Sequence, residues 1–549
     1  MSASRKILVA VMCDSFLLEK WMADALRQIV NENYGEIVLT ILNDSPAIEP
    51  KNIGARFTSY KWNRLLWNRF HKRYGNVDSV KAEDVTDLLG KIAVIRVRPF
   101  LKGKYSQHFS ASAIEEIRKH QPDVILRFGF NILRGEILNA APLGVWSYHH
   151  CDPQVIRGGP GGFWEYLLKQ DKQGAILQRL TDKLDDGIII RQGWFRMIKH
   201  SYSENLNQLL EGTSSWMADA IREVAVNGSL RSISKSDAAD SIRTYPGNFT
   251  MLKFLFVLAA NKFAFHFRQL FTAETWMIGI ADQSLKETLT SGKFDSVKWI
   301  KAPKVSMYLA DPFTLNIEGR ETIICEKYDY QTGKGVISEA ETDKVTYVSE
   351  HHLSYPYPLT INSENYFVPE ASESKHLIAV HAATKETFHL LKNIPCIDAT
   401  VFQDNGLWWI FTNRADRNPD TDLFVYWSEK VEGPYQEHLL NPVRTDIAAS
   451  RPAGNPLIEN GKLTFPMQKG VPHYGAGIAV VEITKLSPTE YEDQLTNTIL
   501  PQAKWHYNEG LHTVSHGPNN TTLIDAKAHR FIFANFSAQL KRKIKRIFN

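Results

Sequence analysis

Short apolar runs alternate with segments of helical periodicity over the first part of the chain. The predicted strands are residues 7–12, 37–42, 93–97 and 123–127. The predicted helices are residues 16–30 and 111–120. Strands that alternate with helices predict an α/β domain with a mostly parallel sheet and helices on its faces. Ligands of such folds bind beyond the carboxyl ends of the strands.

The pattern changes from about residue 276, where strands become short, rich in aromatic residues and separated by turn residues. Units of strand, Gly/Asn turn and strand begin at residues 309, 354, 397, 450 and, more weakly, 511. Their spacing of about 40 to 60 residues predicts an all-β, five-bladed β-propeller, with the first strand of each blade along the central channel.

These patterns divide the chain into four segments. They are residues 1–230 (α/β domain), 231–275 (linker with an amphipathic helix), 276–525 (propeller) and 526–549 (basic amphipathic tail). In the linker, residues 249–271 are rich in Phe and Leu but include three cations. A membrane-spanning helix needs about 20 mostly uncharged residues, so a span is not predicted. A helix packed between domains is favoured over one that lies in a membrane interface.

The C-terminal tail has a pattern of its own. Residues 539–549 carry five cations interleaved with Leu540, Ile544, Ile547 and Phe548. A basic amphipathic helix of this kind suits an anionic lipid surface, and it equally suits a solvated basic helix. Peripheral membrane contact through the tail therefore stays open beside the solvated alternative.

Composition excludes several classes of protein. A chain of 549 residues exceeds one core, so two or three domains are expected. The 64 basic and 60 acidic residues nearly balance, which disfavours nucleic acid as a partner. Four cysteines without Cys-x-x-Cys spacing predict neither a disulfide framework nor a structural zinc site. The N-terminal apolar run is too short for a signal peptide, so we expect a cytoplasmic protein. We also expect no metal cofactor.

Residues 144–187 carry the strongest chemical signal. His149 ends a short strand-like run, a Gly/Pro-rich loop follows, and Asp185 and Asp186 precede Gly187. A positioned imidazole and a carboxylate on a second loop are the parts needed for proton transfer and for stabilising an oxyanion. Each part alone has a structural alternative, since a His at a strand end can simply pack and Asp-Asp-Gly can simply be a turn.

The combined pattern resembles the formyltransferase fold family over residues 5–225. That family has Asn-x-His, then a loop of the type Ser-Leu-Leu-Pro-x-x-x-Gly, then Leu-Asp-x-Gly. The matching pieces here are His149, the loop of residues 153–159, and residues 184–187. Ser147 stands where the family has Asn. The resemblance implies a formyltransferase-type, Rossmann-like fold and 10-formyltetrahydrofolate as cofactor.

The resemblance also implies catalytic roles for His149, Asp185 and Ser147. His149 would polarise the formyl oxygen, and Asp185, rather than Asp186, would orient His149 and relay protons. The hydroxyl of Ser147 is a single donor on a shorter arm than the amide of Asn. The change at this position leaves three options, namely a site rewired through Ser147 or His150, a slow enzyme, or an inactive one.

The folate pocket of this family corresponds to the end of the strand near residues 126–133. The candidate cofactor contacts are Arg127, Phe128, Gly129, Phe130 and Leu184. Packing alone explains the two phenylalanines equally well. The candidate substrate-loop residues are His150, Arg157, Gly158 and Gly159. The glycines there would permit positive φ angles and a close approach of the backbone to the substrate.

Residues 276–525 resemble the propeller found beside plant glucosamine inositolphosphorylceramide transferases and, more distantly, the family 43 glycoside hydrolases. Asp311 and Asp398 match the base and its modulator in those hydrolases, but residues 450–454 lack the general-acid Glu. Hydrolysis needs a protonated carboxyl, so binding of a glycan or nucleotide sugar is favoured. The candidate propeller site is Asp311, Glu370, Asp398 and Arg451, with Arg451 suited to phosphate or carboxylate.

The wording of residues 146–150 and 157–165 resembles formyltransferases from bacterial surface-polysaccharide gene neighbourhoods, which act on nucleotide-linked amino sugars. The predicted function is therefore N-formyl transfer from 10-formyltetrahydrofolate to an amino group of a nucleotide-linked sugar or glycoconjugate precursor, with the propeller recognising the glycan. Two alternatives remain. One is a non-catalytic carbohydrate-binding scaffold, and the other is a 10-formyltetrahydrofolate deformylase that uses water as acceptor. The oligomeric state stays open.

Overall fold

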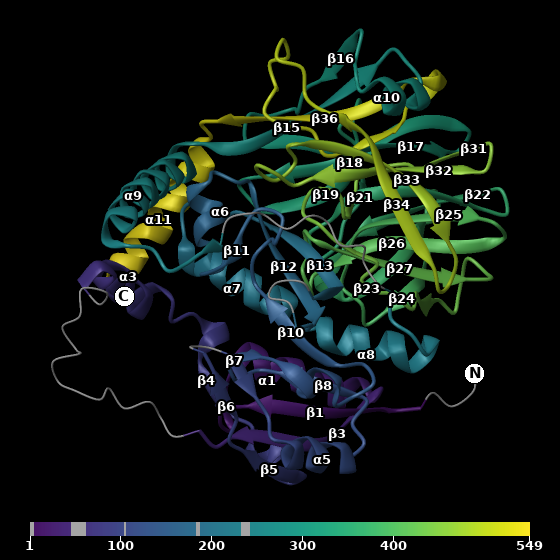
Figure 1. The fold of residues 1–549 in the computed structure, drawn as a ribbon. Coiled ribbons are helices and arrows are strands. Elements are labelled where there is room, and N and C mark those ends of the chain that lie inside the picture. The colour runs from purple at the N-terminus through teal and green to yellow at the C-terminus, as the bar shows by residue number, and fades with distance from the viewer. Residues whose placement is uncertain (1–4, 46–61, 104–105, 183–186, 232–241, 549) are drawn as a thin grey trace. The chain divides into compact units, whose positions relative to one another are not determined.

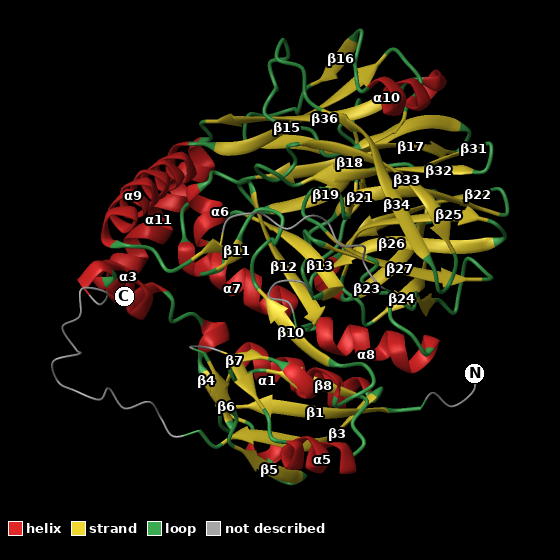
Figure 2. Ribbon diagram, viewed as in Figure 1, coloured by secondary structure: helices red, strands yellow, loops and turns green. Residues whose placement is uncertain are grey.

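The computed structural model describes residues 5–45, 62–103, 106–182, 187–231 and 242–548 (Figure 1). The chain forms two compact units whose boundary lies between Lys262 and Phe263. This boundary falls inside the long helix α9 (Asn248–Phe271). Figure 2 shows that most helices belong to the first unit and that strands dominate the second.

A seven-stranded sheet organises the first unit, in the order β13-β12-β10-β8-β1-β3-β5. Its parallel strands are β1 (Ile7–Cys13), β3 (Gly35–Asn43), β5 (Ala93–Val97), β8 (Val124–Arg127) and β10 (Val145–His149). The antiparallel strands are β12 (Lys172–Arg179) and β13 (Ile188–Arg196). The predicted α/β fold with a mostly parallel sheet is confirmed.

The two faces of this sheet bury alternate residues of each strand, because successive side chains of a strand point to opposite sides. Val9 and Val11 of β1 pack with the core formed by α1 (Lys20–Glu32) and α8 (Trp216–Asn227). Ala10 and Met12 pack on the other face with α5 (Ala111–Lys119).

The shorter elements complete the first unit. The strands are β2 (Leu17–Glu19), β4 (Ala82–Asp84), β6 (Phe100–Lys102), β7 (Ser106–His108), β9 (Ile132–Leu133), β11 (Arg157–Gly158) and β14 (Ile242–Arg243). The helices are α3 (Leu65–Tyr74), α4 (Thr86–Leu89), α6 (Phe163–Leu167) and α7 (Tyr202–Thr213). The helix predicted over residues 16–30 starts later than expected, at Lys20, because residues 17–19 pair with β4 instead.

Five antiparallel sheets make up the second unit, which confirms its all-β character. The first sheet joins β15 (Ala273–Ala281) and β16 (Val297–Ile300) to β35 (Val514–His516) and β36 (Thr522–Arg530). The second contains β17 (Met307–Ile317), β18 (Arg320–Asp329), β19 (Lys334–Glu339) and β20 (Val345–Tyr347). The third contains β21 (Ser354–Ile361), β22 (Glu364–Glu370), β23 (His376–His381) and β24 (Thr387–Lys392).

The last two sheets follow the same plan. One contains β25 (Cys396–Asp404), β26 (Leu407–Arg414), β27 (Asp422–Ser428), β28 (Gln436–Glu437) and β29 (Arg444–Thr445). The other contains β30 (Arg451–Pro452), β31 (Leu457–Glu459), β32 (Lys462–Lys469), β33 (Gly477–Leu486) and β34 (Tyr491–Ile499). The first strands of successive sheets touch in the order β35, β17, β21, β25 and β30, and a bridge between Gly454 and Val514 links the last back to the first.

Three helices accompany these two units at their surfaces, namely α9, α10 (Leu285–Ser291) and α11 (Phe533–Phe548). Met251 and Phe254 are the buried residues of α9 within the described chain. Residues 262–269 of this helix are all exposed. The expectation that this helix packs between domains stays a prediction.

Candidate functional site

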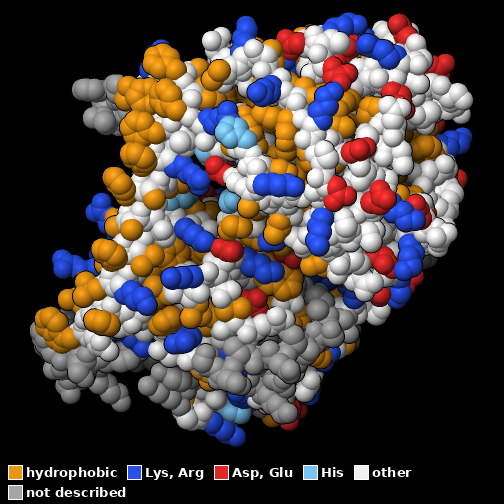
Figure 3. Space-filling view, turned by 90° about the horizontal axis from the view of Figure 1, so that it is seen from above, with side chains coloured by type: hydrophobic (Ala, Val, Ile, Leu, Met, Phe, Trp, Pro, Cys, Tyr) orange, Lys and Arg blue, Asp and Glu red, His pale blue; other side chains and the backbone are white. Residues whose placement is uncertain are grey.

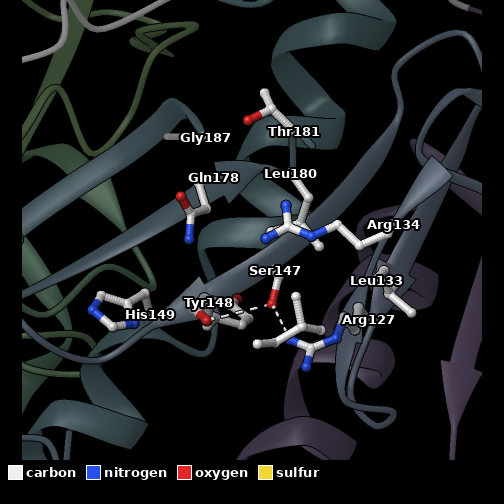
Figure 4. A pocket seen from close by; sticks show the side chains of 11 residues that line it. Arg127, Leu133, Arg134, Ser147, Tyr148, His149, Gln178, Leu180, Thr181 and Gly187 are labelled. Carbon is white, nitrogen blue, oxygen red and sulfur yellow. Dashed lines mark hydrogen bonds between the residues drawn. The ribbon is translucent and has the colours of Figure 1, made fainter. Parts of the chain in front are cut away.

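The first unit carries a cavity at the carboxyl edge of its parallel strands. β8 ends at Arg127 and β10 ends at His149, and because these strands are parallel neighbours their ends share one edge. The cavity has a volume of about 150 Å³. Its lining consists of Arg127, Ile132, Leu133, Arg134, Ser147, Tyr148, His149, Gln178, Leu180, Thr181 and Gly187 (Figure 4). The structure thus brings three residues predicted from the sequence, Arg127, Ser147 and His149, to one cavity.

Arg127 places a cation beside Ser147. Its Nη1 donates to Ser147 Oγ at 2.9 Å, and its Nη2 donates to the carbonyl oxygens of Phe130 and Asn131 at 2.9 and 3.0 Å. The Arg127 Nε is buried without a hydrogen-bond partner. Burial lowers the pKa of Arg127, and nearby Asp14 opposes this effect. Since an arginine keeps its charge in proteins, the cavity holds a fixed positive charge next to the Ser147 hydroxyl.

Ser147 and His149 lie on the same side of β10, because residues two apart in a strand point the same way. The Ser147 hydroxyl accepts from Arg127 and makes only a long contact of 3.4 Å to the carbonyl oxygen of Tyr148. Its proton is therefore well placed to serve an oxygen atom in the cavity. Figure 4 shows the Ser147 hydroxyl between the Arg127 guanidinium and the strand that leads to His149.

Gln178 is a cavity residue that sequence reasoning missed. It lies directly opposite Ser147 in the antiparallel pair β10–β12, so its amide faces the cavity from the neighbouring strand (Figure 4). Gly187 provides the space, because a Cβ atom at Gly187 would stand 2.2 Å from Gln178 Oε1. Gln178 could be identified only from the register of β10 against β12, and no sequence motif gives that register.

His150 belongs to the core beside the cavity and does not line it. Its ring stacks on Tyr148 and meets the edge of Trp21, with centroids 5.6 and 5.1 Å apart. Its Nε2 lies 3.1 Å from Thr213 Oγ1, whose own proton goes to the Leu209 carbonyl, so Nε2 is the donor. Burial, with His149 nearby, lowers the pKa of His150 to about 3. This neutral, packed ring disfavours the hypothesis that His150 replaces the missing Asn.

Residues 128–130, directly after β8, pack into the sheet rather than lining the cavity. Phe128 meets Trp21 edge-on with ring centroids 6.0 Å apart, and Phe130 packs on Phe109 at 5.7 Å. A Cβ atom at Gly129 would collide with Asp14, so Gly129 permits a close turn. Of the predicted cofactor contacts at residues 127–130, Arg127 alone is among the residues that line the cavity.

Leu184 and Asp185, two further predicted site residues, lie outside the described residues. The described residues on either side of them, Thr181 and Gly187, both line the cavity. Asp182 is attached to the same region, because its carboxylate accepts from the backbone N–H of Gly135 at 2.9 Å and its carbonyl accepts from Arg134. The predicted role of Asp185 stays a prediction.

The glycines of the predicted substrate loop serve contacts within the chain. Arg157 and Gly158 form β11, which pairs in parallel with β14. Gly158 has a φ of 97°, and a Cβ atom there would stand 2.1 Å from the carbonyl oxygen of Arg243. The Gly159 N–H donates to the same oxygen at 3.3 Å. The backbone of these glycines was expected to lie close to a substrate, and in the structure it lies close to β14.

Glu165 is a buried acid in the helix that follows this loop. The side chain is fully buried, and neither carboxyl oxygen has a hydrogen-bond partner of normal geometry. Burial raises the pKa of Glu165 to about 7. A buried carboxyl without strong partners favours its neutral form, so Glu165 is mostly uncharged below neutral pH.

The second unit carries a larger and more acidic cavity, with a volume of about 330 Å³. Its lining contains all four residues predicted for this site, Asp311, Glu370, Asp398 and Arg451. The further lining residues are Glu274, Trp276, Tyr308, Glu326, Tyr328, Tyr330, His352, Ser354, Tyr474 and His512. Carboxyl groups beside aromatic rings are typical of sites that bind sugars, because rings cover the apolar faces of a sugar and carboxyls bind its hydroxyls.

A repeated bulge aims residues into this cavity region. The register of β17, β21 and β25 shifts at the same place in each strand, and Asp311, Tyr355 and Asp398 sit there. Their φ angles are 50°, 42° and 48°, which residues other than Gly rarely adopt. Bulges re-aim side chains, and strained backbone clusters at functional sites.

Asp525 and His512 hold Asp311 in place. Asp525 accepts from the backbone N–H groups of His512, Thr513 and Asp311 at 2.9 to 3.1 Å, and its Oδ2 lies 2.6 Å from His512 Nδ1. Asp311 accepts from the Thr513 hydroxyl at 2.6 Å. Three of these side chains lie close enough to hold a metal ion, but the carboxylates are already satisfied by internal donors. The arrangement therefore fits a positioning network better than a metal centre.

Arg451 is engaged by carboxylates inside the fold. Its Nε donates to Asp398 Oδ2 at 2.5 Å and its Nη1 donates to Asp420 Oδ1 at 3.0 Å. Its guanidinium also lies 5.3 Å from the centre of the Tyr474 ring. Two carboxylates already neutralise Arg451, and its suggested role in binding a phosphate or carboxylate ligand stays a prediction.

The surroundings of two carboxyls of this cavity, Glu326 and Glu370, favour the protonated form. Burial, with neighbouring carboxylates, raises the pKa of Glu326 and of Glu370 well above the ordinary value. Glu326 Oε1 has no hydrogen-bond partner. Burial, against the opposing charge of His512, raises the pKa of Asp311 to about 6. Glu326 was missed from the sequence because it lies inside the second strand β18, where no motif marked it.

Sequence comparison finds relatives for part of the second unit. Residues 295–510 match the family described as Glucosamine inositolphosphorylceramide transferase 1, N-terminal. Glucosamine inositolphosphorylceramide transferase 1 of Oryza sativa subsp. japonica is 32% identical over 163 residues, covering 28% of this chain and 22% of the relative. The Arabidopsis thaliana protein of the same name is 26% identical over 210 residues, covering 34% and 27%. The chain thus matches about a quarter of the length of these curated relatives.

Structure comparison finds formyltransferases. The sugar 3N-formyl transferase WlaRD shares 16% identity and a TM-score of 0.26, covering 44% of this chain and 70% of that protein. The formyltetrahydrofolate deformylase of Pseudomonas syringae pv. tomato shares 17% identity and a TM-score of 0.26, covering 40% and 63%. Phosphoribosylglycinamide formyltransferase of Anaplasma phagocytophilum shares 14% identity and a TM-score of 0.27, covering 43% and 98%. Similarity at this level assigns no activity.

Proposed function

We propose that the first unit transfers a formyl group from 10-formyltetrahydrofolate to an amino group of a nucleotide-linked sugar or glycoconjugate precursor. The observation that carries the proposal is the cavity in which the strand ends bring Arg127, Ser147 and His149 together. Three kinds of group meet there, namely a fixed cation, a hydroxyl donor and an imidazole. They are the groups that acyl transfer to an amine requires.

When bound, 10-formyltetrahydrofolate supplies the formyl group. In the transfer, the bond from the formyl carbon to the folate nitrogen breaks and a bond to the sugar nitrogen forms. The sugar amine loses a proton and the folate nitrogen gains one, and His149 carries the proton between them. Ser147, held by Arg127, donates to the formyl oxygen as that oxygen gains negative charge.

Gln178 replaces the family's Asn as the amide that donates to the formyl oxygen. Its amide is the group that Ser147 lacks, and it reaches the cavity from the strand directly opposite. An oxyanion donor can come from any element that brings an N–H group to the same point. A site rewired through Ser147 and Gln178 is therefore favoured over an inactive one.

The lining fits the formyl end of the cofactor. Ile132, Leu133 and Leu180 supply apolar surface for a flat ring, while Arg127 Nε is a buried donor that lacks a partner. These residues would hold the ring, and Ser147 and Gln178 would meet the formyl oxygen. The cofactor assignment also draws on the family motif around His149.

For the second unit we infer a five-bladed β-propeller whose acidic cavity binds the sugar. The contact order of the first strands and the sheet that joins β15 to β36 support a closed ring of blades. Because Arg451 is already paired, the cavity favours a hydroxyl-rich or cationic amino sugar over a phosphate group. The names of the matched relatives, which include glucosamine, agree with an amino sugar.

The test is incubation of the full chain with 10-formyltetrahydrofolate and a panel of amino sugars, free and nucleotide-linked. Release of tetrahydrofolate together with a formylated sugar, detected by mass spectrometry, supports the proposal. The matched variants are His149→Ala in the cavity and His120→Ala at the end of α5. Release of tetrahydrofolate without a formylated sugar assigns a deformylase instead. Equal inertness of wild type and both variants across the panel leaves a carbohydrate-binding protein.

A further inference from the structure

Helix α9 displays an aromatic stripe to solvent. Phe249, Leu252, Phe256, Phe263 and Phe267 fall on one side of a helix with 3.6 residues per turn. All five are exposed, with Phe249 at 86% and Phe256 at 77%. Large apolar side chains gathered on an exposed face mark an interaction site.

Helix α11 adds to this stripe within the second unit. The ring of Phe536 stacks on that of Phe271 with centroids 5.8 Å apart, and Asn535 Nδ2 donates to the carbonyl oxygen of Thr272 at 3.4 Å. Phe531 and Phe533, at the start of α11, are 55% and 72% exposed. Figure 3 shows hydrophobic side chains gathered along the edge of the molecule on which Figure 1 places α9 and α11, with Lys and Arg side chains among them.

The charge of these two helices has a single sign. Neither residues 248–271 nor residues 533–548 contain an Asp or Glu. Their cations are Lys253, Lys262, Arg268, Lys541, Arg542, Lys543, Lys545 and Arg546. A partner that covers this surface must therefore offer both an apolar layer and negative charge.

A basic cavity adjoins the base of α11. It has a volume of about 460 Å³, and Phe531 and Ile532 form part of its lining. Lys301, Lys304 and Arg530 line it too, and no acidic side chain is among its lining residues within the described chain. The cavity is positively charged and lies next to Phe531, so it could bind an anionic group beside the exposed aromatic side chains.

We propose that α9 and α11 form a docking surface for an anionic lipid bilayer, with the aromatic side chains in the interfacial layer and a lipid phosphate group in the basic cavity. Aromatic and aliphatic side chains anchor amphipathic helices in that layer, and cations bind anionic headgroups. This surface shares Trp276 with the acidic cavity but none of the four residues predicted for that site, so the proposal stands independently of the proposed function.

The helix is expected to lie in the plane of the interface rather than to cross the bilayer. By length and composition alone, α9 qualifies as a candidate span. However, Met251 and Phe254 are buried in the core of the first unit, and Asn261 Nδ2 donates to the Tyr166 hydroxyl at 2.7 Å. Arg268 pairs with Glu509 of the second unit at 3.2 Å. Both ends are thus held by folded protein.

The test is flotation of the full chain with vesicles of phosphatidylcholine, with and without phosphatidylglycerol. We expect at least about tenfold stronger partitioning onto the anionic vesicles, and a loss of about tenfold when salt rises from about 0.1 M to about 0.5 M. The double variant Phe263→Ser/Phe267→Ser should lose about tenfold or more. The matched control is Leu495→Ser, since Leu495 is an apolar residue exposed to 59% on β34, and it should bind as wild type does.

Two further arms test depth and the basic cavity. A Phe267→Trp variant should show blue-shifted emission on vesicles and be quenched best by lipids brominated near the headgroup. Lys301→Gln/Lys304→Gln should weaken binding to anionic vesicles and leave binding to neutral vesicles unchanged. Equal binding to both vesicle types, full binding by the serine variant, or quenching best at the bilayer centre would overturn the proposal. So would self-association through these phenylalanines without vesicle binding, which would assign the surface to a second copy of the chain.

Discussion

The two cavities of this chain handle charge in opposite ways. In the first unit, Arg127 brings a fixed cation to the edge where parallel strands end. In the second unit several carboxyls lie close together, and the pKa values of Glu326 and Glu370 rise because burial and then neighbouring carboxylates disfavour ionisation. The first cavity suits an atom that gains negative charge during a reaction. The second suits a neutral or cationic ligand that is rich in hydroxyls.

The architecture explains the difference. Parallel strands deliver one or two residues each to a shared edge, so a few well-spaced groups define the first cavity. Several strands converge on the second cavity, so its lining draws polar residues from many sheets at once. Several of these residues are carboxyls, and carboxyls that are buried close together have raised pKa values.

The largest expected effect is on catalysis in the first cavity. We expect His149→Ala to lower kcat for formyl transfer by about 10² to 10⁴-fold, because the proton shuttle is lost. The measurement is the rate of tetrahydrofolate release at saturating substrates. His120→Ala should keep wild-type activity, and a His149→Ala enzyme of undiminished kcat would contradict the assignment of His149.

The second prediction concerns Gln178 as an oxyanion donor in the first cavity. We expect Gln178→Leu to lower kcat by about 10² to 10³-fold, the usual loss of one oxyanion donor. Adding Ser147→Asn to that variant should restore part of the lost rate, because it returns an amide to the family position. Activity that survives Gln178→Leu unchanged would show that the oxygen is bound by other groups.

Glu165 offers a test of buried charge in the first unit, where burial is the largest cause of its raised pKa. The pKa of Glu165 is about 7 in the folded chain, above the ordinary value of 4.5, so the folded state binds its proton more tightly. Its ionisation therefore removes stability as pH rises from about 4.5 to about 7, by about 3 kcal/mol in full. We expect Glu165→Gln to raise the melting temperature of the first unit at pH 8 and leave it unchanged at pH 4, as followed by calorimetry. A stabilisation independent of pH would point to another cause.

The smallest expected effect concerns ligand affinity in the second cavity. Because the pKa of Asp311 is about 6, its carboxylate is charged above that pH and neutral below it. We expect the affinity for an amino sugar with a free ammonium group to rise about tenfold between pH 5 and pH 7, as one additional charge pair forms in the partly buried site. Titration calorimetry should show this rise for glucosamine but not for its N-acetyl form. Asp311→Asn should abolish the pH dependence of the affinity. A pH dependence that remains in this variant would show that another group binds the ammonium.

Local patterns predicted the elements of the first unit well, because hydrophobic periodicity depends on neighbours in the sequence. The strands predicted at residues 93–97 and 123–127 match β5 and β8 closely. The start of α1 was missed because residues 17–19 pair with β4, about 65 residues away along the chain.

The candidate sites were predicted only in part, for a similar reason. His149, Ser147 and Arg127 could be found because the family resemblance pointed to them, and Arg127 and His149 also end strands that the sequence reveals. Gln178 could not, because its role depends on its pairing with Ser147 across two strands. Arg451 was expected to bind an anion, but its pairing with Asp398 and Asp420 joins residues more than 30 positions apart.

By itself, the sequence determined the two fold classes, the strand end that carries His149, the first strand that carries Asp311, and the excess of cations in the C-terminal tail. These follow from periodicity and composition, which short stretches of chain contain. Only the tertiary structure decided which charges are already paired, which acids have raised pKa values, and which aromatic side chains are exposed. Those properties depend on distances and burial between segments far apart in the chain, and electrostatic and hydrophobic free energies are set by these distances and by burial.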